Sequence, residues 1–168
     1  MMLEIAIDAD EEWDSSRSLE QLVRTAAEAA IAESAFPELT TSPRPVELSV
    51  LLTGDEQVRA LNGKWRGKDK ATNVLSFPMA DADDFQSANV VGPELLLGDI
   101  ILARGVCEAE ARDKNVPIED HAAHLLIHGT LHLLGYDHHD ETQAAEMEAR
   151  EVRALRRLGI ANPYEVTA

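Results

Sequence analysis

Three histidines in the last third of the chain have a spacing that suits one metal ion. They are His128, His132 and His138, in the segment HGTLHLLGYDH. On an α-helix, residues i and i+4 lie on one face, so His128 and His132 can present two nitrogens to the same ion. Gly135 can leave the helix in a left-handed conformation and bring His138 back beside them. Three imidazoles with an open fourth position are typical of catalytic zinc sites.

The same spacing occurs in the metzincin proteases, whose motif is HExxHxxGxxH. Gly129 stands where those proteases have glutamate. A protease of that kind needs the carboxylate to carry a proton from the zinc-bound water to the leaving amine. The sequence therefore argues against a peptidase, unless a distant carboxylate such as Glu141 or Glu146 takes over that role.

Two more segments accompany the histidines. They are NGKWRGKDKATNVLSFP at residues 62–78 and LGDI at residues 97–100. Together with the histidine segment, they resemble the three signatures of the YbeY family, in the same order, over residues 46–160. The resemblance implies a zinc-dependent endoribonuclease with one Zn²⁺, acting on single-stranded rRNA near the 3′ end of the small-subunit rRNA. It also implies the small ribosomal subunit or its associated proteins as partners, and a part in ribosome quality control.

Length and composition favour one domain. A chain of 168 residues is of ordinary domain size, so we expect residues 1–168 to form a single metal-dependent hydrolase domain. The first residues lack a basic stretch followed by an apolar core, and no apolar run reaches the length of a membrane span. We therefore expect a cytoplasmic protein with no membrane partner. Cys107 is the only cysteine, so no disulfide can form within the chain, and we expect it to be a small buried residue.

The net charge argues against a nucleic-acid substrate, whereas its distribution argues for one. The chain has 31 acidic and 15 basic residues, giving a net charge of −16, and such a surface repels phosphates. A positive patch nevertheless lies between residues 59 and 70, where one acidic residue, Asp69, accompanies five basic ones: Arg59, Lys64, Arg66, Lys68 and Lys70. We expect this patch to contact RNA; the alternative is a solvated loop.

Within the patch, Arg66 is the candidate catalytic residue. A guanidinium can hold two phosphate oxygens and balance the charge that develops during phosphodiester cleavage. The alternative is an ordinary surface arginine. The neighbouring Trp65 can stack on an unpaired base or anchor the segment in the core.

All six histidines fall between residues 121 and 139, so the ligand set must be chosen among them. His124 stands two helical turns before His132, about 11 Å of rise, which is too far for a shared ion. We therefore assign His121 and His124 to supporting, substrate-facing or surface roles. His139 competes with His138, and the spacing favours His138. Asp137 can accept the free N–H of a ligand histidine or stabilise the turn.

Hydrophobic patterning predicts an α+β or α/β fold, with a mixed sheet of about four strands and about five helices. We expect the metal site at the C-terminal end of a central helix. The region 81–92 is predicted to be a loop, and Asp99, inside an apolar strand, needs a buried donor or a cation as partner. The expected strands are 2–8, 46–52, 73–77 and 95–102, and the expected helices are 18–34, 53–61, 103–114, 117–134 and 140–158.

Two functions remain open from the sequence. The first is the endoribonuclease, in which zinc hydroxide or the 2′-hydroxyl of the RNA attacks the phosphate. The alternative is a ribosome-associated binding factor that the metal stabilises and that has little hydrolytic activity of its own. Imidazole ligands suit nickel and iron as well as zinc, so the physiological metal also remains open.

Overall fold

Four strands form one mixed sheet in the computed structural model, which describes residues 3–10, 13, 17–89 and 92–164. The strand order is β1-β2-β4-β3. The pairs β1–β2 and β2–β4 are parallel, whereas β3 runs antiparallel to β4 at the edge of the sheet. Residue 2, the first of the predicted strand 2–8, lies outside the described residues. The strands are β1 (Leu3–Ala9), β2 (Val46–Thr53), β3 (Val74–Pro78) and β4 (Leu95–Ala103).

Within the described residues, six α-helices and two 3₁₀-helices accompany the sheet, which makes the fold α+β, as predicted. The predicted helices 18–34, 103–114, 117–134 and 140–158 match α1, α4, α5 and α6 within two residues at each end. The helices are α1 (Arg17–Ala32), η1 (Pro37–Thr41), α2 (Asp55–Arg66), α3 (Ala82–Gln86), η2 (Ser87–Asn89), α4 (Arg104–Lys114), α5 (Ile118–Leu133) and α6 (Glu141–Arg157).

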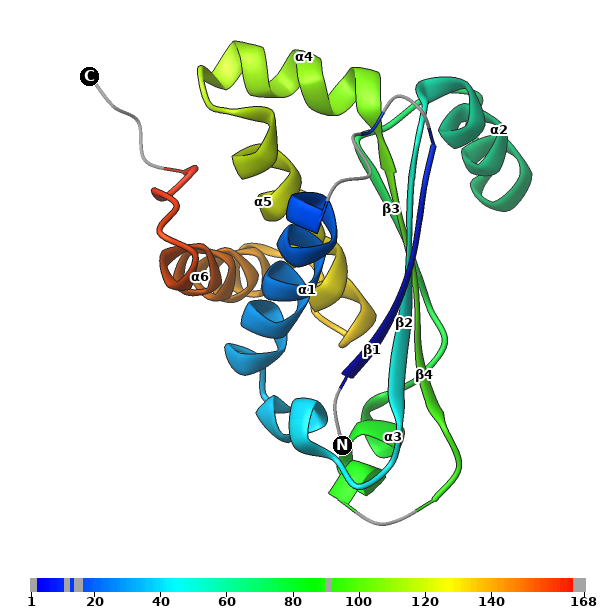
Figure 1. The fold of residues 1–168 in the computed structure, drawn as a ribbon, viewed down its shortest axis with the longest axis vertical. Helices are drawn as coiled ribbons and strands as arrows, with labels where there is room; N and C mark the ends of the chain where they lie inside the picture. Colours follow the sequence, from blue (N-terminus) through cyan, green and yellow to red (C-terminus); the bar gives the residue numbers. More distant parts are fainter. Residues whose placement is uncertain (1–2, 11–12, 14–16, 90–91, 165–168) are drawn as a thin grey trace.

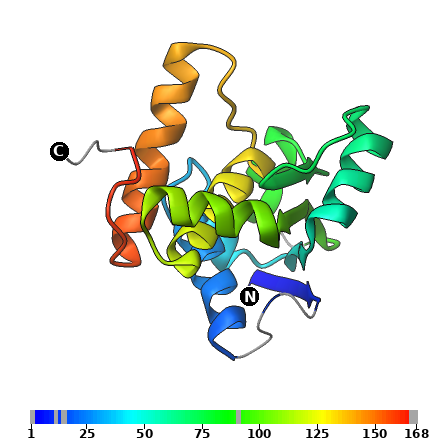
Figure 2. The same ribbon diagram turned by 90° about the horizontal axis from the view of Figure 1, so that it is seen from above.

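The helices lie unequally on the two faces of the sheet. Helices α1, α5 and α6 gather on one face, and α2 lies alone on the other (Figures 1 and 2). The strands explain this arrangement, because alternate side chains point to opposite faces. Val50, Leu52 and Ile100 enter the large core beneath α1 and α5, whereas Leu75 and Ile101 pack with Val58 of α2.

Two glycines allow close contacts around the central helix α5. A Cβ on Gly129 would lie 3.0 Å from Cγ2 of Ile100, so the glycine lets α5 approach strand β4. Gly98 has φ +139°, and a Cβ there would lie 2.2 Å from the carbonyl oxygen of Phe77 and 2.9 Å from Leu133. The helix that carries two of the three candidate ligands, His128 and His132, is therefore fixed closely against β4.

Three local expectations need correction. The described part of 81–92 is not a plain loop: Asp81 and Asp84 form a capping box that opens α3, and Phe85 is buried against Phe36. Helix α2 continues past the predicted residue 61 to Arg66, where Gly67 ends it in a left-handed conformation. Asp99 is half-buried beside a cavity on the α2 face of the sheet, and its carboxylate has no hydrogen bond or ion pair within the described residues.

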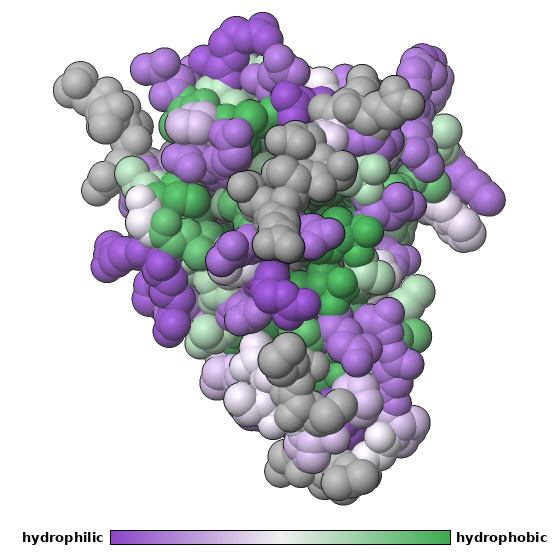
Figure 3. Space-filling view, in the orientation of Figure 1, coloured by the Kyte–Doolittle hydropathy of each residue, from purple (hydrophilic) through white to green (hydrophobic). Residues whose placement is uncertain are grey.

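The remaining features of the fold are the distribution of polar and apolar side chains on the surface and the burial of Cys107. A space-filling view shows hydrophilic side chains at the top, over α4 and α2, with hydrophobic ones gathered in the middle of that face (Figure 3). Among the described residues, no helix is long and apolar enough to cross a membrane. Cys107 is buried as predicted, and burial raises the pKa of its thiol to about 12.

Candidate metal centre

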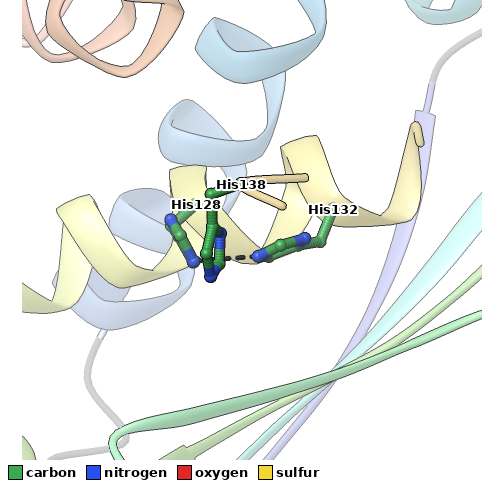
Figure 4. A group of neighbouring side chains, drawn as sticks. All are labelled: His128, His132 and His138. Atoms are coloured by element: carbon green, nitrogen blue, oxygen red, sulfur yellow. Dashed lines mark hydrogen bonds between the residues drawn. The ribbon is translucent and has the colours of Figure 1, made fainter. Parts of the chain in front are cut away.

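The structure brings the three predicted histidines together. One ring nitrogen from each of His128, His132 and His138 lies within 4.8 Å of the other two. The Nε2 atoms of His128 and His132 are 3.0 Å apart, and the three rings point toward one another (Figure 4). We call these residues the histidine cluster. Such an arrangement can hold one metal ion, with exposed His138 on the solvent side.

The backbone turn after α5 is what returns His138 to the helix. Gly135, with φ +98°, donates its N–H to the carbonyl of His132 at 3.0 Å, and Tyr136 donates to Leu131 at 3.1 Å. These two bonds form a Schellman motif, the usual way in which a glycine ends a helix. Nothing lies within 4 Å of a Cβ placed on Gly135, so the left-handed backbone, rather than space, requires glycine here.

His132 is oriented by the same turn. Its Nδ1 lies 2.9 Å from the carbonyl oxygen of Tyr136, which places the ring proton on Nδ1 and leaves the Nε2 lone pair facing the cluster. Burial, followed by the nearby His128 ring, lowers the pKa of His132 to about 4. The imidazole is therefore neutral near pH 7, the form that binds metals.

Glu151 orients His128, and sequence reasoning missed it. Its Oε2 accepts the Nδ1–H of His128 at 3.3 Å, while Oε1 lies 2.6 Å from Nε2 of His124 and 2.8 Å from the hydroxyl of Tyr164. Burial raises the pKa of this carboxyl, but the hydrogen bonds from His124 and His128 outweigh that effect and lower it to about 2. The residue is 1% exposed. The sequence contained one signal for this role: Glu151 lies on the same apolar stripe of α6 as Met147 and Leu155.

The other histidines lie outside the cluster. His121 contacts Glu110, with 2.8 Å between Nε2 and Oε1, and His124 reaches the cluster only through Glu151. His139 is exposed, and its Nε2 lies 2.8 Å from Asp137. The Asp137 Oδ1 accepts the backbone N–H of His138 at 2.8 Å. The main role of Asp137 in the structure is therefore to hold the backbone of the turn.

Packing against the sheet excludes a glutamate from position 129, where the metzincin proteases have their general base. Gly129 follows His128 by one residue and points at Ile100 of the sheet. A glutamate there would enter the contact between α5 and β4 instead of facing the cluster. The close approach of α5 to β4 therefore leaves no room for a glutamate side chain at position 129.

Arg66 is not placed beside the histidines. It ends α2, on the sheet face opposite α5, and its guanidinium carbon lies 6.0 Å from the ring centroid of Phe77. Phe77 belongs to edge strand β3 and packs with the α2 side of the sheet. The two predicted parts of the site are therefore separated by β3, whose other side contacts α5.

The positive patch is only partly available. Arg59 is bound to Asp69, with 2.8 Å between Nε and Oδ1, and this pair raises the pKa of Arg59 and lowers that of Asp69. Trp65 is 63% exposed, so it is not a core anchor, and the ammonium of Lys64 lies 5.0 Å from its ring centroid. Of the five basic side chains in the patch, four have no ion pair with a carboxylate of the described residues: Lys64, Arg66, Lys68 and Lys70.

Comparisons with known proteins agree with one another. A family model described as "Endoribonuclease YbeY" matches residues 5–159. A protein of that name from Rhizorhabdus wittichii is 47% identical over 167 residues, covering 99% of each chain. Another, from Sphingopyxis alaskensis, is 48% identical over 164 residues, covering 97% of this chain and 98% of its own. A solution structure from Thermotoga maritima shares the fold, with a TM-score of 0.55, 23% identity, and coverage of 96% and 99%.

Proposed function

The chain belongs to the endoribonuclease YbeY family, and from this premise we propose that it is a metal-dependent endoribonuclease acting on single-stranded rRNA. The observation that carries the metal dependence is the pair of Nε2 atoms, 3.0 Å apart, in two rings whose Nδ1 atoms are held by other groups. When each ring carries its proton on Nδ1, both Nε2 atoms are acceptors and cannot form a hydrogen bond with one another. One cation between them would bind both lone pairs.

The residues fit a divalent ion such as Zn²⁺. His128, His132 and His138 would hold it, each through one neutral nitrogen, and a fourth position would stay open for the substrate. When bound, the ion would polarise a phosphate oxygen and acidify a water molecule. Glu151 would keep the lone pair of His128 directed at the ion, as carboxylates do for many histidine ligands.

Arg66 is proposed to act on the RNA backbone from the other side of β3. Because β3 is the edge strand, an RNA strand crossing it would meet the histidine cluster on one side and Arg66 on the other. Arg66 has no ion pair within the described residues, so its guanidinium is available to bind two phosphate oxygens. Exposed Trp65 would stack on a neighbouring base.

The nucleophile separates two routes that the missing glutamate leaves open. If the 2′-hydroxyl attacks, a new bond to phosphorus forms as the bond to the 5′-oxygen breaks, so one product ends in a 2′,3′-cyclic phosphate and DNA resists cleavage. If water attacks, the products are linear and a deoxynucleotide at the cleaved bond is tolerated. End-group analysis of the products distinguishes the two routes.

In the cell, we propose a role in maturation of the 3′ end of small-subunit rRNA and in ribosome quality control, in the cytoplasm. The relatives from Rhizorhabdus wittichii and Sphingopyxis alaskensis are named as endoribonucleases, which supports the ribonuclease activity. The small subunit or its proteins would then present the RNA to an enzyme whose own charge is −16. We also propose that residues 1–168 form one hydrolase domain, since the family match spans residues 5–159.

The test is cleavage of a short single-stranded RNA by wild type, His132→Ala and Arg66→Ala, each checked for folding and metal content. We expect His132→Ala to lose metal and activity, and Arg66→Ala to keep metal while losing at least tenfold in cleavage. Arg59→Ala is the matched control, because Arg59 lies in the same helix but is bound to Asp69. Equal cleavage by all four proteins would identify a contaminating nuclease and overturn the proposal.

The alternative is a metal-stabilised binding factor with little hydrolysis of its own. Two observations favour it: the net charge of −16 and the separation of Arg66 from the histidine cluster by β3. It predicts that metal removal lowers the melting temperature and RNA binding together, while purified wild type leaves the RNA intact.

A further inference from the structure

A cavity of about 330 Å³ adjoins the histidine cluster and plays no part in the function proposed above. His128 belongs to both the cluster and the cavity wall. The rest of the wall comes from α4, the first half of α5, the start of β3 and Tyr164. This volume is at the lower end of the range of about 300 to 1,000 Å³ found for small-molecule sites, which suits one base or nucleoside.

The inner wall presents a fixed hydrogen-bond acceptor. Oε1 of Glu110 lies 2.8 Å from Nε2 of buried His121 and accepts a bond from the Asn73 amide at 3.0 Å. Within the described residues, Oε2 of Glu110 has no hydrogen-bond partner, and the side chain is 35% exposed. A carboxylate held by two bonds on one oxygen offers the other to a ligand without first having to be ordered.

The rim carries one negative and one positive side chain, Asp113 and Lys114, which are both exposed. Lys114, in the last turn of α4, lines the same cavity, is exposed, and has no ion pair with any described carboxylate. A group with hydrogen-bond donors at its inner edge would match Glu110, and a phosphate at its outer edge would meet Lys114 as well as Asp113. A nucleotide has this polarity when its base enters the cavity and its phosphate stays at the rim.

We propose that this cavity is a base-binding subsite that prefers adenine, cytosine or guanine to uracil. These three bases carry an exocyclic amino group that can donate to Oε2 of Glu110, whereas uracil presents carbonyl oxygens at its exocyclic positions and has only the recessed ring N3–H as a donor on that edge. Because His128 is shared, the bound base belongs to a nucleotide next to the bond that is cut. The inference rests on the proposed ribonuclease function and adds a sequence preference to it.

The experiment uses metal-loaded wild type, Glu110→Gln and Glu108→Gln with fluorescent oligouridines that contain no other base or one A, C or G. Anisotropy measures binding, and end-labelling maps the cuts. We expect wild type to bind the strands with an amino-bearing base at least fivefold more tightly and to cut at a fixed distance from that base. In Glu110→Gln the two existing bonds hold the amide oxygen, so its NH₂ occupies the free corner and the preference falls at least threefold, toward uracil.

Glu108→Gln is the matched control, because Glu108 lies in the same helix, pairs with Arg104 and Arg112, and does not line the cavity. It should behave as wild type. If wild type cuts RNA without regard to base, or if Glu110→Gln keeps the wild-type preference, the subsite is overturned and the ribonuclease stands. If wild type cuts nothing but binds with a preference that Glu110→Gln loses, the ribonuclease is overturned and the subsite stands.

Discussion

At the scale of single residues, Glu151 connects the histidine cluster to the interior. A buried carboxylate that accepts the N–H of a metal-binding histidine fixes the tautomer and raises the basicity of the ring. We expect Glu151→Gln to lower Zn²⁺ affinity by about 10- to 100-fold, since an amide accepts a weaker hydrogen bond from His128 than a carboxylate does. Competition with a chelator of known affinity measures this loss.

Glu141→Gln serves as the comparison for that change, because Glu141 is exposed in the first turn of the same helix. A loss shared by both variants would mean that the charge of α6, rather than the contact with His128, controls affinity. Unchanged affinity in Glu151→Gln would show that His128 needs no carboxylate to bind the ion.

The pKa values of two site residues predict how the stability of the metal-free protein depends on pH. The pKa of His132 is about 4 in the folded chain against an ordinary 6.5, so between these values the unfolded chain binds more protons. The free energy of unfolding therefore falls as pH decreases from 6.5 to 4, by about 2 kcal/mol after allowing for solvent screening of the half-buried ring. Glu151, at about 2 against 4.5, extends the fall below pH 4.5.

Urea denaturation at several pH values between 7 and 4 checks this dependence, with His132→Ala as the comparison. The variant should lose less stability over the upper part of the range, since it lacks the titrating ring. A stability that stays level or rises as pH decreases from 6.5 to 5 in wild type would contradict the prediction.

At the scale of elements, the turn after α5 matters more than the helix itself for completing the cluster. Gly135 and Gly159 both end a helix with positive φ, at +98° and +76°, and neither has an atom within 4 Å of an added Cβ. Alanine at either position should cost about 1 to 2 kcal/mol of stability, from the strained backbone. Only Gly135→Ala should also weaken metal binding, because only that turn positions His138.

Thermal unfolding and metal titration of both variants test this expectation. Equal metal affinities in Gly135→Ala and Gly159→Ala would mean that His138 reaches the cluster by some other restraint, or that it is not a ligand.

The same elements show why some parts of the site could be predicted from the sequence and others could not. His128, His132 and the glycine turn are related by local helix geometry, which the sequence records directly. Glu151 meets His128 only through the packing of α6 on α5, and nothing in their separation of 23 residues specifies that contact. Likewise, Arg66 lies across β3 from the histidines because β3 is at the edge of the sheet. The hydrophobic pattern of the sequence does not specify the order of the strands.

At the scale of the whole molecule, a small positive region must act within a strongly negative field. Lys68 and Lys70 follow α2 and form no ion pair with a described carboxylate. If both contact phosphates, the double variant Lys68→Ala/Lys70→Ala should reduce the slope of log affinity against log salt by about 1.4 for single-stranded RNA. Binding at four salt concentrations measures the slope. Arg112→Ala/Arg156→Ala removes the same charge elsewhere and should leave the slope unchanged.

The position of Glu151 in α6 also sets the moment at which the histidine cluster gains its buried carboxylate. Translation delivers the chain from its N-terminus, so the sheet and α5 leave the ribosome before α6 does. Until α6 packs, His128 lacks its carboxylate and His124 lacks the same partner. A chain in which α6 has not yet packed therefore has the three histidines without the carboxylate that orients His128.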